Sequence, residues 1–204
     1  MPWRWRRRPR VPAIALLLLP AALLLHQLRD APFRVAAAAS SAGGSALPTG
    51  FDTAQNTADL AIVLMSEASV GMPVEQESVG WTVVNRMLRN HTQSVRAVWG
   101  GYSRSQPHPA RFLIALGADI LGGRVPDPTE GCTHFYTPKT MPKAGATPAD
   151  RQGYDTAGGL EQVAGTTEMN YRPGWALRFA YQPIPGVRPM YYKFYRAPGN
   201  GPVR

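Results

Sequence analysis

TADLAIVLMSEA, residues 57–68, is the stretch that decides the fold expected for this chain. Its apolar residues are too dense for a helix that lies on a surface, so the stretch predicts a helix buried on most sides. Asn56 or Thr57 is the expected N-cap, because both side chains can accept a backbone hydrogen bond. The predicted helix ends at Glu67 and Ala68, so a carboxyl group lies at the end of a nearly all-apolar surface.

Two further helices follow. Residues 73–90 carry apolar residues at helical spacing, with Pro73 in the first turn, acidic residues early and basic residues late. Residues 109–121 predict a third helix, which the two glycines at 122 and 123 end.

The remainder of the chain predicts a small β element. Residues 132–136 form an aromatic extended stretch, and residues 137–174 are rich in loops. Two strands are expected at residues 175–181 and 190–196, joined by the turn at 182–187. A helical lobe followed by a small C-terminal β element makes the expected fold class α+β.

The N-terminal residues 1–39 predict a segment for export. They begin with MPWRWRRRPR and continue with the 15-residue apolar run VPAIALLLLPAALLL. This order is typical of a signal peptide, and an uncleaved anchor in the inner membrane stays open as the alternative. Residues 40–50 (SSAGGSALPTG) predict a flexible linker, so the folded domain is expected over residues 51–204. The arginines would stay in the cytoplasm, which places the domain in the periplasm or cell envelope.

The charge of the chain does not favour nucleic-acid binding. Its 22 Lys and Arg and 13 Asp and Glu residues give a net charge of +9, but seven of the arginines and one acid precede residue 40. The 15 basic and 12 acidic residues that remain leave only +3 on the domain. A surface that binds phosphates needs clustered basic residues on the folded domain itself.

A metal or another cofactor is not expected. The single cysteine, Cys132, excludes an internal disulfide and a zinc site built from several cysteines. His91 and His108 lack the spacing of metal ligands. A thiol nucleophile is not favoured either, because Cys132 and His134 share one face of a strand without the geometry for a direct hydrogen bond.

Glu67 is the first candidate for chemistry. A carboxyl group held against apolar walls keeps its proton near neutral pH, because desolvation raises its pKa, and a protonated carboxyl can act as a general acid. The alternative is a glutamate that emerges into solvent at the helix end or pairs with an arginine.

Thr133-His134-Phe135-Tyr136 is the second candidate. In a strand, Thr133 and Phe135 face one side, and His134 and Tyr136 face the other. A polar-aromatic pair of this kind suits a sugar-binding wall. A core histidine among packed aromatic residues is the alternative.

Several motifs recur at fixed distances from Glu67. Ser66-Glu67-Ala68 is followed by Gln76, nine residues after the glutamate, and by Asn85-Arg86, of which Asn85 lies eighteen residues after it. Further along, residues 127–138 read DPTEGCTHFYTP, residues 173–176 read PGWA, and residues 194–195 read FY. Over residues 57–196 these motifs resemble the bacterial cell-wall hydrolases of the spore-cortex-lytic (SleB) type.

The chain departs from the pattern of that family at three places. Residues 69–71 read SVG where the family has Arg-Gly-Glu, Cys132 replaces an alanine, and Thr137 replaces an asparagine. The stretch 139–167 is also longer than usual for the family.

The resemblance implies a lysozyme-like α+β fold and an enzyme that binds peptidoglycan. Such an enzyme cleaves the glycan strand between N-acetylmuramic acid and N-acetylglucosamine, as relatives that are lytic transglycosylases do. The resemblance implies Glu67 as the catalytic acid, with no cofactor. It assigns substrate contacts or the positioning of Glu67 to four residues, Asn85, Thr133, His134 and Tyr136.

Two other classes of function are weighed against this one. An exported peptidoglycan-binding or assembly-scaffold module without activity is the alternative, because the residues after Ala68 differ from the family. An amidase or peptidase that cuts the stem peptide would need metal ligands or a Cys-His pair that the sequence does not offer.

Overall fold

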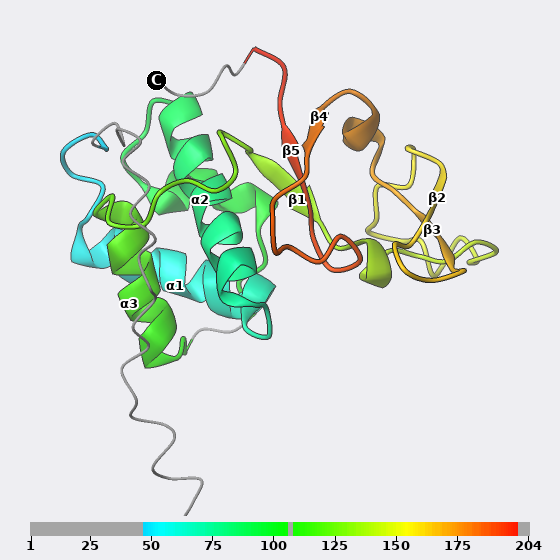
Figure 1. Ribbon diagram of the computed structural model, residues 1–204, viewed down its shortest axis with the longest axis horizontal. Coiled ribbons are helices and arrows are strands. Elements are labelled where there is room, and N and C mark those ends of the chain that lie inside the picture. Colours follow the sequence, from blue (N-terminus) through cyan, green and yellow to red (C-terminus); the bar gives the residue numbers. More distant parts are fainter. Residues whose placement is uncertain (1–46, 106–107, 200–204) are drawn as a thin grey trace, which may run out of the picture. The chain divides into compact units, whose positions relative to one another are not determined.

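The computed structural model describes residues 47–105 and 108–199, and in these ranges the fold is α+β (Figure 1). The predicted export segment, residues 1–39, lies outside the described residues. Of the predicted linker only residues 47–50 are described, and Leu47 there packs against the main hydrophobic core. Within the described ranges, no helix is both long enough and apolar enough to cross a membrane.

The first helix, α1 (Ala54–Ala68), confirms the prediction from residues 57–68, but its cap differs. Asn56 and Thr57 are not the cap: the hydroxyl of Thr53 accepts the Asn56 amide at 3.1 Å. Asn56 is buried instead, and its side-chain nitrogen donates to the carbonyl groups of Phe51 at 3.0 Å and Gln93 at 2.7 Å. These two carbonyl groups, of which that of Gln93 is distant in sequence, hold Asn56 inside the helix.

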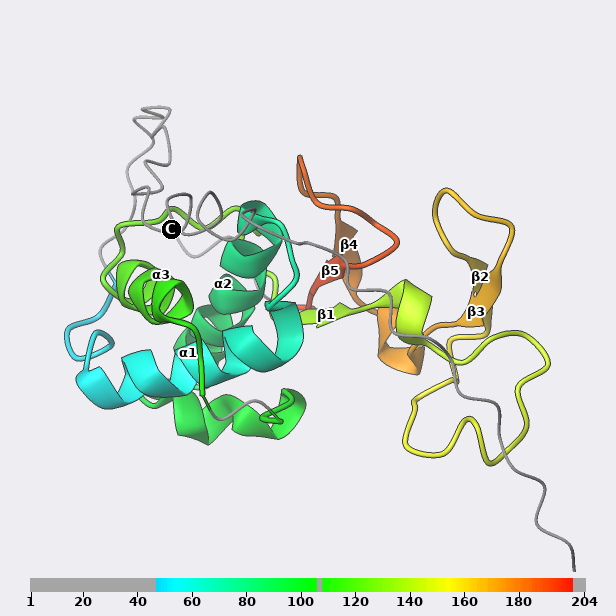
Figure 2. The same ribbon diagram turned by 90° about the horizontal axis from the view of Figure 1, so that it is seen from below.

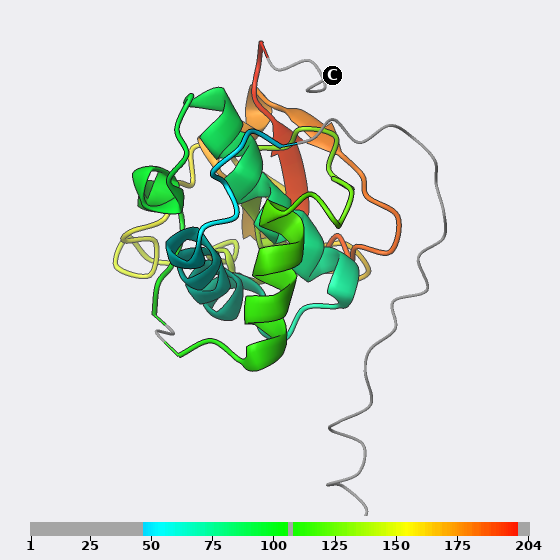
Figure 3. The ribbon, with the colours of Figure 1, turned by 90° about the vertical axis from the view of Figure 1, so that its left-hand side faces the viewer.

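The two other predicted helices are confirmed as α2 (Pro73–Arg89) and α3 (Arg111–Leu121), with α3 starting two residues later than expected. All three helices pack on one another (Figure 3). Their apolar faces form most of the main core. The largest fully buried apolar side chains of the three helices are Leu60, Leu64, Met87, Leu113, Ile120 and Leu121.

Five short strands form two antiparallel sheets in the described residues. In the first sheet β5 (Lys193–Arg196) is central, between β1 (His134–Tyr136) and β4 (Ala180–Gln182). In the pairing of β1 with β5, Phe135 lies opposite Phe194. The second sheet joins β2 (Leu160–Gln162) to β3 (Met169–Tyr171), within a stretch that the sequence predicted only as loop. Figure 2 shows β1 leading from the helices toward β2 and β3.

The predicted strand at residues 175–181 is wrong over most of its length. Gly174–Leu177 forms a 3-10 turn, and strand pairing begins only at Ala180. The ring of Trp175 packs edge-on against Tyr136 and Tyr195, at centroid distances of 5.8 and 5.3 Å. Side-chain packing in the β element therefore prevails over the strand propensity of the aromatic residues. The other predicted strand, 190–196, also begins later, at Lys193.

Strand β1 separates two hydrophobic clusters, and its side chains alternate as predicted. Phe135 contacts Tyr102, Tyr192 and Phe194 in the main core. His134 and Tyr136 contact Trp175 on the other side, where a smaller cluster contains Tyr136, Met141, Ala176 and Tyr195. The two faces of β1 thus pack against different clusters, Phe135 on one side and His134 and Tyr136 on the other.

Candidate active site

Glu67 lies one residue before the end of α1 and is half-buried. Its carboxylate accepts the backbone amide of Ser103, from the segment that follows the 3-10 helix η1 (Val95–Gly101). Its own backbone carbonyl accepts the hydroxyl of Tyr192 at 2.9 Å. Two segments distant in sequence therefore hold this turn of α1 and its carboxyl group in place.

The pKa of Glu67 lies above its usual range. Burial is the larger cause, because the charged form loses hydration next to apolar atoms. The hydrogen bond from the Ser103 amide and the positive charge of Arg86 act in the opposite direction and lower the pKa, without cancelling the effect of burial. A carboxyl group with a raised pKa stays protonated closer to neutral pH and can serve as a general acid.

Asn85 holds a turn next to α2 in place. Its side-chain nitrogen lies 3.0 Å from Oδ2 of Asp127, 3.2 Å from Oγ1 of Thr129 and 3.1 Å from the carbonyl oxygen of Cys132. The two hydrogens of this amide are thus shared among three acceptors inside the protein. This favours a role in positioning the loop before β1 over a direct contact with substrate.

Thr133, directly before β1, contacts the half-buried His134 at the start of the strand. Thr133 is fully buried, and its hydroxyl lies 2.9 Å from Nδ1 of His134. The imidazole ring packs 5.2 Å from Trp175 and edge-on against Phe179 at 4.7 Å, measured between ring centroids. Thr133 therefore orients the histidine ring, and the exposed part of the pair belongs to His134.

His134 is neutral at physiological pH. Burial is the larger cause that lowers its pKa to about 4, and the positive charges of Arg86 and Arg89 lower it further. A neutral imidazole offers one donor and one acceptor nitrogen, and Nδ1 already lies against Thr133. Nε2 is the nitrogen left to bind a hydroxyl or amide group of a ligand.

Tyr136 is buried in the smaller cluster, with Met141, Ala176 and Tyr195. Its hydroxyl donates to the Glu161 carboxylate, which also pairs with Lys193 at 2.8 Å. Burial first, and then the bond to Glu161, raise the pKa of Tyr136. Its polar atom is thus bound inside the β element, and no described contact joins it to Glu67.

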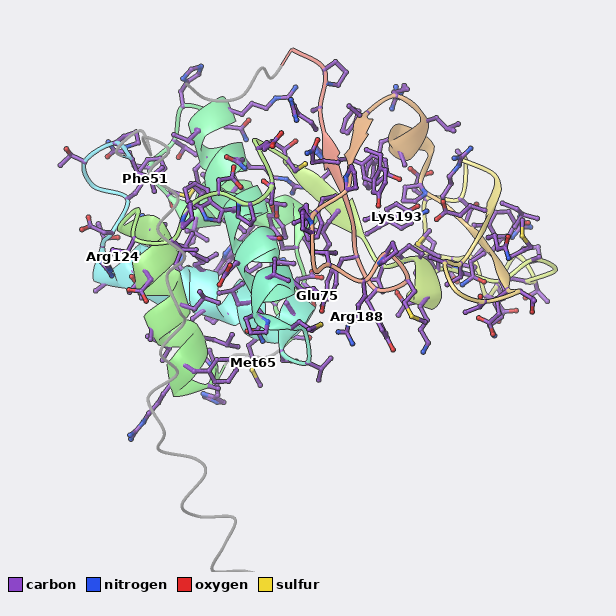
Figure 4. All side chains as sticks on the ribbon, viewed as in Figure 1. Phe51, Met65, Glu75, Arg124, Arg188 and Lys193 are labelled. Carbon is purple, nitrogen blue, oxygen red and sulfur yellow. The ribbon has the colours of Figure 1, made fainter. Side chains whose placement is uncertain are left out.

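Glu75 and Glu77, the first acids that follow Glu67 in the sequence, differ in their surroundings. The fully buried Glu75 accepts the Met72 amide at 2.8 Å and pairs with Arg188 at 2.7 Å (Figure 4). Burial would raise the pKa of Glu75, but the hydrogen bonds from Arg188 and Met72 together lower it below its usual range. For Glu77, burial alone raises the pKa.

Cys132 is a poor nucleophile in this environment. Its side chain is fully buried, and burial, followed by the negative charge of Asp127, raises the pKa of its thiol to about 12. The reactive thiolate is therefore scarce at neutral pH. Among residues 47–105 and 108–199, no three His, Cys, Asp or Glu side chains are grouped so that they could hold a metal ion.

No family model, curated protein or solved structure matches the chain. The likeness to SleB-type hydrolases thus rests on the sequence motifs and stays a prediction.

Sequence reasoning missed three residues around Glu67. Ser103 contributes a backbone amide, which leaves no signature in a sequence. Tyr192 lay in a predicted strand but contacts Glu67 through its hydroxyl. Arg86 was part of a matched motif, but no role followed from its position in the sequence. Gly101, two residues before Ser103, was a sequence signal for the close approach of another group, because glycine has no Cβ atom.

Proposed function

We propose that the chain is an exported cell-wall hydrolase that cleaves the glycan strand of peptidoglycan between N-acetylmuramic acid and N-acetylglucosamine, as a lytic transglycosylase. One observation carries the proposal: Glu67, at the end of a buried helix, has a raised pKa and a fixed orientation. The motifs that resemble SleB-type hydrolases supply the substrate class. On this proposal the helices α1–α3 form the helical lobe of a lysozyme-like fold.

The reaction needs one carboxyl group that first gives and then takes a proton. Protonated Glu67 donates to the glycosidic oxygen as the bond from this oxygen to C1 of the muramic sugar breaks. The Glu67 carboxylate then accepts the proton of the C6 hydroxyl of the same sugar, whose oxygen bonds to C1. The products are a 1,6-anhydro muramic end and a free hydroxyl on the next sugar, and water is not consumed.

The surroundings of Glu67 favour this scheme over one with two carboxylates. Ordinary glycosidases place a second carboxyl group across the scissile bond, about 5–9 Å from the acid. Within the described part of the chain, none of the charged groups that shift the pKa of Glu67 is a second carboxylate. Glu75 is bound to Arg188 and Met72, so it is not free to serve as the partner.

His134 is, in addition to Glu67, the proposed contact for substrate. Its ring is held by Thr133 and by two aromatic side chains, and it stays neutral. A neutral, oriented imidazole can bind an acetamido or hydroxyl group of a sugar without taking its proton. Asn85 and Thr133 would act by holding the segment that carries it.

Digestion of purified sacculi by the full chain tests the proposal. Mass spectrometry of the released muropeptides should find 1,6-anhydro ends. Muropeptides with reducing ends would make the protein a muramidase, and free stem peptides would make it an amidase or peptidase. Binding to sacculi without any product would support the scaffold module instead.

A further inference from the structure

Arg86 occupies the space between the two predicted site motifs. Its side chain leaves α2, and the guanidinium carbon lies 4.4 Å from the centroid of the Tyr102 ring. Its Nε donates to the carbonyl group of Thr133, directly before β1. A single side chain from α2 thus contacts the segment after η1 on one side and the start of β1 on the other.

The chain leaves room for this guanidinium by placing a glycine beside it. A Cβ atom at Gly101 would lie 1.9 Å from Nη1 of Arg86, far closer than a Cβ atom approaches a heavy atom to which it is not bonded. At the neighbouring Gly100, a Cβ atom would meet nothing within 4 Å. The backbone at Gly101 and the guanidinium are therefore in direct contact, and this contact lies two residues before Ser103.

The segment packed on Arg86 is the one that binds Glu67. Tyr102 stacks on the guanidinium, and the next residue, Ser103, gives its amide to the Glu67 carboxylate. On the other side, the Thr133 carbonyl that Arg86 holds belongs to the residue that orients His134. Displacing Arg86 would release both partners together.

We propose that Arg86 is the positioning residue of this site. It holds the Ser103 amide against Glu67 and holds Thr133 against His134. It also supplies the positive charge that stabilises the Glu67 carboxylate. The role of Arg86 in catalysis rests on the proposed function. In that reaction Glu67 first gives up its proton and then acts as a base, so its charged form must be stabilised between the two steps. The structural role of Arg86 rests on the contacts alone.

The groups that face Glu67 make Arg86 its main electrostatic neighbour. The Ser103 amide follows η1, and the hydroxyls of Tyr102 and Tyr192 come from that segment and from the chain before β5. Burial chiefly raises the pKa of each of these two tyrosines to about 12, so both are neutral at physiological pH. In the described residues, the charge that lowers the pKa of Glu67 is that of Arg86.

Two different substitutions should displace the charge and give the same result. Arg86→Met removes the guanidinium and keeps much of the apolar volume. Gly101→Ala keeps the charge but inserts a methyl group where Nη1 lies. The backbone angle φ of Gly101 is not in the left-handed region, so alanine adopts it without strain. Gly100→Ala is the matched control, since its methyl group enters open space.

The measurement is the pKa of the Glu67 carboxyl by ¹³C NMR titration of the full chain, with the signal assigned by its loss in Glu67→Gln. Arg86→Met and Gly101→Ala should each raise this pKa further, and Gly100→Ala should leave it as in the wild type. The double variant should match Arg86→Met alone, because the added methyl group then meets no guanidinium. In sacculus digestion, kcat of the two single variants should fall about tenfold to a hundredfold, as is typical for loss of positioning.

An unchanged Glu67 pKa in a folded Arg86→Met protein would overturn the inference, and so would a Gly101→Ala effect that adds to that of Arg86→Met. Should Arg86→Met fail to fold, the Gly101→Ala shift decides by itself. The pKa readout does not depend on activity. If the variants shift the pKa of Glu67 as expected but the wild type releases no muropeptide, the proposed function is refuted and the role of Arg86 stays in place.

Discussion

Replacement of Asn85 by alanine should destabilise the domain, because the structure uses this side chain to hold the turn before β1. The amide nitrogen has three acceptors at 3.0 to 3.2 Å, one of them the Asp127 carboxylate, and the residue is 4% exposed. A hydrogen bond to a charged group is worth about 1.5–3 kcal/mol, and a buried acceptor left unpaired costs about 1–3 kcal/mol. Asp127 is half-buried and keeps its bonds from the amides of Thr129 and Gly131, which reduces the loss.

We therefore expect Asn85→Ala to lower the free energy of unfolding by about 2–3 kcal/mol. For a domain of this size that corresponds to a fall in melting temperature of about 4–12 °C. Asn90→Ala is the matched control at the exposed end of the same helix and should change stability by less than about 0.5 kcal/mol.

Asn85→Asp should destabilise more than Asn85→Ala, since it puts a carboxylate against the Asp127 carboxylate and the Cys132 carbonyl. These neighbours would raise the folded-state pKa of the introduced carboxyl group. The loss of stability is therefore largest above that pKa, and it shrinks as the pH falls and the carboxyl gains a proton to donate. Thermal unfolding followed by circular dichroism across pH measures both effects. An Asn85→Ala protein that melts like Asn90→Ala but binds sacculi poorly would refute the reasoning and return Asn85 to the substrate.

Three further predictions follow from the site. The raised pKa of Glu67 should appear as a falling alkaline limb in the pH–rate profile for sacculus digestion, and Glu67→Asp should shift or remove it; an unmoved limb would mean that another group sets it. Cys132→Ala and treatment of the wild type with a thiol-alkylating reagent or EDTA should leave activity in place, whereas loss of turnover with an unchanged melting temperature would revive thiol or metal chemistry. The pKa of Glu75 is lowered in the folded state, so the stabilisation by Glu75 is present above the unfolded-state pKa and is lost as the pH falls through the folded-state pKa. Glu75→Gln should therefore make the free energy of unfolding depend less on pH on the acid side. An equally steep dependence would exclude the ion pair of Glu75 with Arg188 as its cause.

The helical part of the fold was readable from the sequence because local signals and burial agree there. The density of apolar residues before Glu67 predicted a helix buried on most sides, and in α1 none of residues 59–68 is exposed. Period-two alternation predicted that Phe135 faces one side and that His134 and Tyr136 face the other, and the ring contacts confirm this. Each of these predictions depends only on neighbours close in sequence.

The predictions that were wrong concern features that depend on residues distant in sequence. Thr53, Asn56 and Thr57 are all good caps by type, and the choice among them follows from the Gln93 carbonyl, 37 residues from Asn56, which keeps Asn56 inside the helix. Trp175 has a high strand propensity, yet the rings of Tyr136 and Tyr195 hold it in a turn.

The candidate site shows the same limit. Glu67 could be predicted as a candidate because apolar residues surround it in the sequence. The group of Ser103 that binds its carboxylate is a backbone amide, which every residue except proline has, so the sequence does not indicate it. Arg86 could be located in a motif, but its role follows only from the space at Gly101 and the carbonyl of Thr133.

The most direct test of the central claim is digestion of sacculi in H₂¹⁸O by the wild type and by Glu67→Gln, with mass spectrometry of the muropeptides. Glu67→Gln is nearly isosteric but has no proton to give, so its rate should fall by about 10² to 10⁴ while its melting temperature stays close to that of the wild type. The wild type should release 1,6-anhydro ends without ¹⁸O, because the C6 hydroxyl and not water attacks C1. Reducing ends that carry ¹⁸O, or a Glu67→Gln protein that keeps more than about a tenth of the wild-type rate, would contradict a single-glutamate transglycosylase.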